Sequence, residues 1–168
     1  MRLLRLGGLL VLVLLVSAAC SLLGRGDLVE PSSVPPGFQA VPGGSCGVAF
    51  PSDWKRDALA EGELLYEGTA GRGSLHQFTE LDPTRPEEPL PKFVGFYART
   101  AVQVSARQAI QVPGAEAAFQ LRLAGADGST HLVVYGHDSQ RQAGCWVLVT
   151  PADATAEQVA RTLRVGEG

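Results

Sequence analysis

An unbroken apolar run near the N-terminus limits how much of this 168-residue chain can belong to a fold. The run covers the eleven residues 6–16, and Arg2 and Arg5 precede it. It is too short for a membrane-spanning helix, which needs about 20 apolar residues, but it matches the central region of an export signal. We therefore expect residues 1–19 to be a signal peptide that is removed, so the fold must come from the rest of the chain.

The end of this run resembles the lipobox of bacterial lipoprotein precursors. Its residues are Val16-Ser17-Ala18-Ala19-Cys20, with Ser17 where the common lipobox has Leu. The resemblance implies cleavage before Cys20 and a diacylglyceryl group on its sulfur. Two or more acyl chains hold a protein durably on a membrane. We expect a mature protein anchored through Cys20 to the extracytoplasmic face of the cell membrane. The alternative is an ordinary secretory signal that leaves Cys20 as a free thiol.

Residues 20–44 are expected to be the lipid anchor and a flexible tether. Twelve of the residues 21–44 are Gly, Pro or Ser, a composition that buries too little apolar surface to fold. The tripeptide Arg25-Gly26-Asp27 can bind integrins when exposed, but it also arises by chance in chains rich in Arg and Gly. The remainder, residues 45–168, is expected to form a single domain.

Alternating polar and apolar residues predict an antiparallel set of strands in this domain. The expected strands cover residues 47–50, 63–69, 74–81, 116–123, 130–137 and 145–150. Glycine-containing turns at residues 70–73 and at Asp127-Gly128 join neighbouring strands as hairpins.

Helical spacing predicts two helices, and the order of all these elements favours an α+β fold in which an antiparallel sheet packs against helices. The first helix is expected from Pro91, after a loop at residues 82–91 that contains four prolines. One face of it carries Phe93, Phe96, Tyr97, Thr100, Ala101 and Val104. The second is expected from Thr155, whose hydroxyl would cap it while Gln158 reciprocates. Its inner face is Ala156, Val159, Ala160 and Leu163.

The chain from residue 47 to 165 resembles the PsbP-like fold. The residues that carry the resemblance are Val48-Ala49-Phe50-Pro51-Ser52-Asp53-Trp54, in which a short strand leads into Pro and Trp, and Gly114-Ala115-Glu116-Ala117 at the start of a later strand. This α/β/α sandwich is shared by photosystem PsbP proteins, a Ran-binding nuclear transport factor and small bacterial lipoproteins of the LpqN type. The resemblance implies a binding or assembly role and supplies no catalytic residue.

Two of the three cysteines remain if Cys20 is lipidated. Cys46 lies at the edge of the first expected strand and Cys145 opens the last. An even number of cysteines in an oxidising compartment favours a disulfide. It would close a loop of about 100 residues, which the chain-entropy model values at about 4.7 kcal/mol. The alternative is a pair of buried, reduced thiols.

Two segments match nucleophile motifs but lack their context. Gly43-Gly44-Ser45-Cys46-Gly47 fits the G-x-S-x-G pattern, with Asp127 and His131 following in the order of a hydrolase triad. That motif needs a strand before it and a helix after it, whereas here a Pro-rich segment precedes and a strand follows. Gln142-Ala143-Gly144-Cys145-Trp146 echoes a cysteine-protease nucleophile, but no His follows Cys145 and the chain has no Asn.

Metal and nucleotide sites are not indicated, and no cofactor is expected. His131 and His137 point to the same face of one strand about 20 Å apart, too far for one metal ion, although His76 with one of them stays open. Asp82, Glu87 and Glu88 are expected to be a solvated loop. Gly71-Arg72-Gly73 lacks the third Gly and the helix of a dinucleotide site.

Charge also excludes one class of partner. The chain has 14 basic and 17 acidic residues, a formal charge of −3 and no dense Lys/Arg cluster, which argues against nucleic-acid binding. The leading hypothesis is a non-enzymatic lipoprotein whose domain binds an envelope protein or glycolipid across its sheet face or its 82–91 loop. The first alternative is a carrier of a small apolar or lipid ligand, with Phe93, Phe96 and Tyr97 lining a pocket. A hydrolase is the third.

Overall fold

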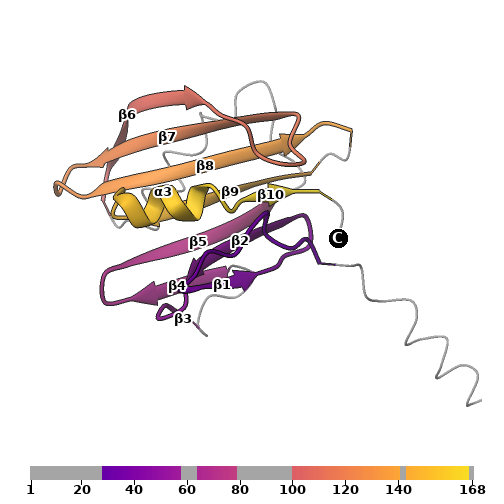
Figure 1. The fold of residues 1–168 in the computed structure, drawn as a ribbon. Helices are drawn as coiled ribbons and strands as arrows, with labels where there is room; N and C mark the ends of the chain where they lie inside the picture. The colour runs from indigo at the N-terminus through magenta and orange to yellow at the C-terminus, as the bar shows by residue number, and fades with distance from the viewer. Residues whose placement is uncertain (1–27, 58–63, 79–99, 141–142, 167–168) are drawn as a thin grey trace, which may run out of the picture.

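The computed structural model describes residues 28–57, 64–78, 100–140 and 143–166, and these residues are mostly β-structure (Figure 1). The elements are β1 (Phe38–Val41), β2 (Cys46–Pro51), β3 (Lys55–Arg56), β4 (Leu64–Gly68), β5 (Gly71–Phe78), β6 (Val102–Ala109), β7 (Ala117–Gly125), β8 (Thr130–Asp138), β9 (Ala143–Thr150), α3 (Ala154–Ala160) and β10 (Arg164–Val165). No helix among these residues is long and apolar enough to cross a membrane.

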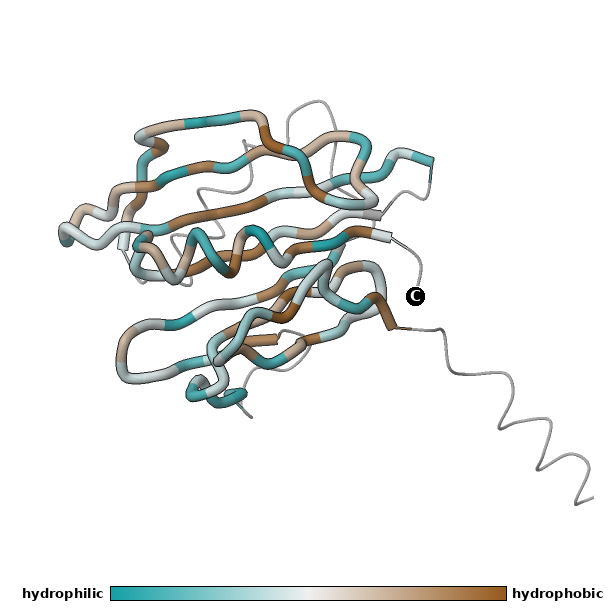
Figure 2. The backbone as a smooth tube through the Cα atoms, in the orientation of Figure 1, coloured by the Kyte–Doolittle hydropathy of each residue, from teal (hydrophilic) through white to brown (hydrophobic). Residues whose placement is uncertain are grey.

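Seven strands form one large antiparallel sheet in the order β3-β4-β5-β9-β8-β7-β6. Tight turns join β4 to β5 and β7 to β8, and the second of these has Gly128 at φ +83°. The strands with the most apolar sequences, β8 and β9, lie near the middle of the sheet, where both faces can be covered (Figure 2).

A second layer covers one face of the large sheet. It consists of α3 and a small antiparallel sheet of order β1-β2-β10, which contact β8, β9 and β5 (Figure 1). Alternate side chains of β9, namely Cys145, Val147 and Val149, enter this interface and pack with Phe50 and Leu163. The main core therefore lies between the two layers.

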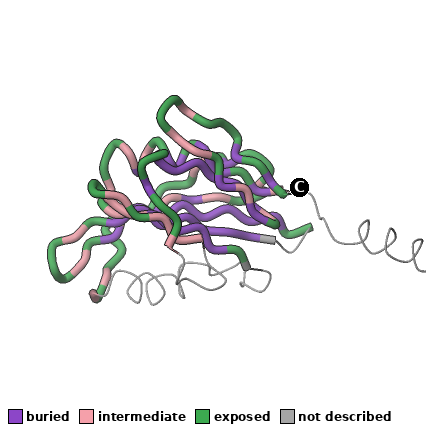
Figure 3. Tube along the Cα trace, turned by 90° about the horizontal axis from the view of Figure 1, so that it is seen from below, coloured by how far each residue is buried: buried purple, intermediate pink, exposed green. Residues whose placement is uncertain are grey.

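The opposite face of the large sheet is also apolar and buried. Its cluster consists of Phe119, Leu121, Leu123, Val133, Tyr135, Trp146 and Leu148. Figure 3 draws long stretches of the central strands in purple, the colour of buried residues. Because β8 and β9 contribute to both clusters, their sequences read as continuous apolar runs, as expected for strands that are covered on two sides.

The expected fold class, an α+β sheet packed against helices as an α/β/α sandwich, is wrong. The described residues contain one helix, the seven-residue α3, and two antiparallel sheets. Val104 was expected on a helix face but lies in the edge strand β6, where it pairs with Leu123. Val102-Gln103-Val104 fits a strand as well as a helix, and ladder pairing with β7 overrides the helical spacing. Phe93, Phe96 and Tyr97 lie outside the described residues.

The fold begins earlier than the sequence suggests. Part of the expected tether, Phe38–Val41, forms β1 and pairs with β2. Val29 is 2% exposed, and its N–H donates to the carbonyl of Gly43 at 2.8 Å. The prolines of this segment lie outside β1, so they cost the ladder no hydrogen bond. Residues 28–44 therefore belong to the folded domain.

The N-cap of helix α3 lies two residues earlier than expected. Asp153, not Thr155, is the N-cap, and its Oδ1 accepts from the Ala156 N–H at 3.0 Å. On the sheet side, the Arg122 guanidinium of β7 contacts the Glu157 carboxylate, which ties the helix to the large sheet. Leu163 lies beyond the helix but remains fully buried in the core.

Candidate functional site

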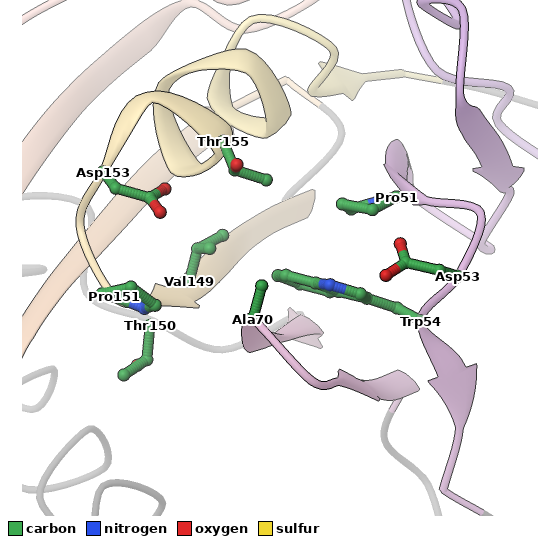
Figure 4. Close-up of a pocket in the computed structure, with 9 residues that line it drawn as sticks. All are labelled: Pro51, Asp53, Trp54, Ala70, Val149, Thr150, Pro151, Asp153 and Thr155. Carbon is green, nitrogen blue, oxygen red and sulfur yellow. The ribbon is translucent and has the colours of Figure 1, made fainter.

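A cleft opens at one end of the domain, where three turns far apart in the sequence meet (Figure 4). These are the turn between β2 and β3, the turn between β4 and β5, and the link from β9 to α3. The cleft has a volume of about 230 Å³. It is lined by Pro51, Asp53, Trp54, Ala70, Val149, Thr150, Pro151, Asp153 and Thr155.

Trp54 forms a fixed wall of this cleft. Its ring stacks on Phe50 with the centroids 5.8 Å apart. It lies against glycines of the β4–β5 hairpin, because a Cβ at Gly68 would overlap its Cδ1 and one at Gly73 would lie 2.9 Å from its Cζ3. The Gln39 side chain of β1 donates to the Trp54 carbonyl at 2.7 Å. The indole therefore packs against β2 and the β4–β5 hairpin, while Gln39 of β1 holds the backbone of the same residue.

Two carboxylates flank the opening. Asp53 and Asp153 lie on opposite sides, and Trp54 and Ala70 lie between them (Figure 4). Asp153 uses one oxygen to cap α3. Neither Lys nor Arg is among the residues that line this cleft. The site thus combines an apolar floor with negative charge at both ends.

The expected triad residues Asp127 and His131 come together, but around Ser129 instead of Ser45. The Ser129 Oγ lies 2.5 Å from Asp127 Oδ1 and 2.9 Å from His131 Nε2. On its other side, His131 Nδ1 lies 2.7 Å from Thr150 Oγ1. The hydroxyl therefore sits between carboxylate and imidazole, whereas a nucleophile triad places the imidazole in the middle.

The surroundings of this network favour a neutral His131 and an ionised Asp127. Burial lowers the pKa of His131, and the nearby Arg72 lowers it further. Hydrogen bonds from Ser129 lower the pKa of Asp127. A neutral imidazole beside an ionised carboxylate suits a structural chain of hydrogen bonds at the β7–β8 turn. The other hydroxyl, Ser45 Oγ, lies 3.1 Å from Gln77 Oε1 instead.

The remaining histidines lie on the second face of the sheet, apart from the cleft. His76 stacks on Trp146 with the centroids 3.8 Å apart, and its Nε2 lies 2.7 Å from Ser74 Oγ. Burial lowers the pKa of His76 to about 4, so its ring is neutral at pH 7. His137 lies 6.5 Å from the Tyr135 ring, measured between centroids. In the part of the chain that the structure describes, no cluster of His, Cys, Asp and Glu could hold a metal ion.

Cys46 and Cys145 form a disulfide that joins β2 of the small sheet to β9 of the large one. The sulfur atoms are 2.09 Å apart and the Cα atoms 6.4 Å apart. Gly71-Arg72-Gly73 lies within β5, where Gly71 and Gly73 back the Trp54 ring, so these glycines serve packing. Cys20, Asp82, Glu87 and Glu88 lie outside the described residues.

Sequence reasoning missed the Trp54 cleft. In the sequence, Asp53 and Trp54 belong to the segment that resembles the PsbP-like fold, Ala70 lies in a hairpin turn, and Asp153 has no expected role. The available signal was the spacing of Gly68, Gly71 and Gly73, which leaves one face of a hairpin without side chains. Such a bare stripe is typical of a place where a large ring or another backbone approaches closely.

Comparison with known proteins identifies the fold and nothing finer. No protein-family model matches the chain, and no curated protein matches it either. The solution structure of cyanobacterial PsbP (CyanoP) from Synechocystis sp. PCC 6803 is similar, with 12% identity, a TM-score of 0.52, and coverage of 86% of this chain and 95% of that one. The crystal structure of the Saccharomyces cerevisiae Ran-binding protein Mog1p is similar at 10% identity and a TM-score of 0.50, over 84% of this chain and 96% of that one. The domain therefore has the PsbP-like fold, and its described residues form this fold mostly from strands, with α3 as their one helix.

Proposed function

We propose that this chain is a membrane-anchored, extracytoplasmic lipoprotein whose domain is a non-enzymatic binding or assembly module of the bacterial cell envelope. The observation that carries the proposal is the apolar run that ends at Val16-Ser17-Ala18-Ala19-Cys20. The disulfide between Cys46 and Cys145 supports it, because such bonds persist in oxidising compartments outside the cytoplasm.

The fold and the chemistry of the described residues support a binding role. Of the two similar structures, Mog1p is described as a Ran-binding protein. The serine that meets both a carboxylate and an imidazole, Ser129, has them in an order unsuited to nucleophile activation. An envelope protein or glycolipid is the kind of partner that a domain held at the membrane would meet.

The anchor is tested by the mass of the mature N-terminal peptide after expression of the full chain in a bacterial host. We expect a peptide that begins at Cys20 and carries a diacylglyceryl group, with the protein in the membrane fraction. Cys20→Ser should abolish the lipid and release the protein. Ser17→Leu, which restores the common lipobox, should keep both. An unmodified Cys20, or cleavage at another residue, would contradict the proposal.

The binding role is tested by cross-linking the anchored chain in intact envelopes. We expect one protein or glycolipid species to be recovered in a fixed ratio to the chain and to disappear when the domain is unfolded by reduction and urea before cross-linking. Recovery of no discrete species from native envelopes would count against a binding module.

A further inference from the structure

We propose that the outer face of the small sheet docks on anionic phospholipid headgroups, so that the domain lies on the membrane that holds its lipid anchor. The proposal deepens the proposed function and rests on the lipidation of Cys20. We call the surface the docking patch, and it consists of two exposed apolar side chains, Leu28 and Val34, and two exposed arginines, Arg161 and Arg164.

The chain leaves little distance between the anchor and the docking patch. The fold begins at Leu28, because the next residue, Val29, is buried and its N–H donates to the Gly43 carbonyl at 2.8 Å. Only the seven residues 21–27 separate Cys20 from Leu28. The eight steps from Cys20 to Leu28 extend to at most about 29 Å, whatever their conformation. An anchored domain therefore meets lipid headgroups at a high local concentration, which makes a weak surface contact effective.

Side-chain direction places the start of the patch on the outer face of the small sheet. In β2, Cys46 and Val48 enter the core against the large sheet, so Gly47 between them points outward. A Cβ at Gly47 would overlap the Val29 carbonyl oxygen, so the chain at Val29 runs directly over this outer face. Arg164 pairs with Gly47 in the ladder, and its side chain therefore points to the same face.

The same segment continues to the end of α3 and brings the second arginine into the patch. The Ser32 N–H donates to the Thr162 carbonyl at 2.9 Å, and the Ser32 hydroxyl donates to the Arg161 carbonyl at 3.1 Å. Leu28 precedes this contact and is 55% exposed, and Val34 follows it and is 49% exposed. Two of the three exposed large hydrophobic side chains among the described residues thus lie in one segment beside two arginines.

Charge favours anionic lipid over zwitterionic lipid. Arg161 and Arg164 are exposed, and neither forms an ion pair with a carboxylate of the described residues. Glu30 is the one acidic residue between Leu28 and Val34, so the patch has two basic groups for one acidic group, whereas the whole chain has a formal charge of −3. Basic side chains are attracted to an anionic membrane surface, and exposed apolar side chains bury in its interface.

The test uses the mature full-length chain in lipid nanodiscs, with the lipid on Cys20 confirmed by peptide mass. A gadolinium chelate on a lipid headgroup speeds the relaxation of amide protons that lie close to the bilayer. In discs that contain phosphatidylglycerol, we expect the largest enhancement at Leu28, Ser32 and Arg164. We expect much less at Val104, whose strand β6 forms the edge of the large sheet away from the small sheet (Figure 1). Discs of phosphatidylcholine alone should show a smaller difference.

Matched charge variants separate the patch from the anchor. Arg161→Gln and Arg164→Gln should each lower the ratio of docked to undocked chain about fivefold, which corresponds to about 1 kcal/mol for one basic group at an anionic surface. Lys55→Gln removes the same charge from an exposed residue of β3 and should leave the ratio unchanged. Glu30→Gln should raise the ratio, because it removes the acidic group of the patch.

The outcomes distinguish failure of the docking from failure of the proposed function. Leu28→Ser should lower the docked ratio, whereas Val104→Ser removes an exposed apolar side chain elsewhere and should not. An unmodified Cys20 would contradict the lipid anchor and the docking together. With Cys20 lipidated, equal enhancement at Leu28 and Val104, or arginine variants that behave like Lys55→Gln, would overturn the docking and leave the anchor intact.

Discussion

At the scale of single residues, the fold shifts the pKa of His76 far from its ordinary value. Its imidazole lies parallel to the Trp146 indole, with an interplanar angle of 10°, and the residue is 8% exposed. A charged imidazole would lose most of its hydration there. Burial therefore lowers its pKa from 6.5 to about 4.

This pKa makes the stability of the domain depend on pH. Between about pH 6.5 and 4 the unfolded chain binds a proton at His76 and the folded chain does not, so the free energy of unfolding falls as the pH falls. The shift corresponds to at most about 3 kcal/mol across that window. His131, whose pKa is also lowered, adds to the fall. Urea unfolding at pH 7 and pH 4.5 measures it.

His76→Phe is the matched variant, because it keeps a ring on Trp146 and removes the titrating group. We expect it to lose a smaller amount of stability than the unaltered chain between the two pH values, with the remainder due to His131 and the carboxylates. An equal loss in both proteins would mean that His76 titrates alike in the folded and unfolded chain.

Among the elements, α3 shows how a local rule selects one of two neighbouring candidates. Thr155 with Gln158 looks like a capping pair, but the N-cap lies two residues earlier, where the Asp153 carboxylate accepts the Ala156 N–H. Asp153→Ala should therefore lower the free energy of unfolding by about 1 kcal/mol, the usual cost of a lost N-cap. Asp153→Asn should cost little. Thr155→Ala should also cost little, and thermal unfolding of the three variants measures the difference. A larger loss of stability for Thr155→Ala than for Asp153→Ala would show that Thr155 is the N-cap.

The strands that could be predicted are those in which buried and more exposed residues alternate clearly along the sequence. In β7, Phe119, Leu121 and Leu123 alternate with more exposed residues, so its position was evident within two residues. β3 and β10 have two residues each, too few to show a period. β6 follows a segment with helical spacing, and its pairing with β7 could be learned only from the partner. The cleft was beyond prediction for the same reason, since Trp54, Ala70 and Asp153 meet only through the order of the strands.

In the molecule as a whole, the small sheet and the large sheet are separate hydrogen-bonded units that share one core. Phe50 and Val48 of β2 pack on Val147 and Val134 across the interface. Besides the backbone, the bond between Cys46 and Cys145 links the two units covalently, and both residues are fully buried. Because β2 lies near the start of the domain and β9 near its end, this bond holds together segments that are 99 residues apart.

The disulfide should therefore contribute strongly to the stability of the whole domain. A loop of this length is worth about 4.7 kcal/mol in the chain-entropy model, and native disulfides typically contribute 2–5 kcal/mol. We expect Cys46→Ala with Cys145→Ala to lower the free energy of urea unfolding by that range, and we expect a reducing agent to destabilise the unaltered chain but not the double variant. Alkylation under denaturing conditions, read by mass, gives the redox state in each sample. Equal stability of the oxidised and reduced chains would show that apolar packing alone joins the two layers, because the unfolded ensemble would then gain no measurable freedom when the bond opens.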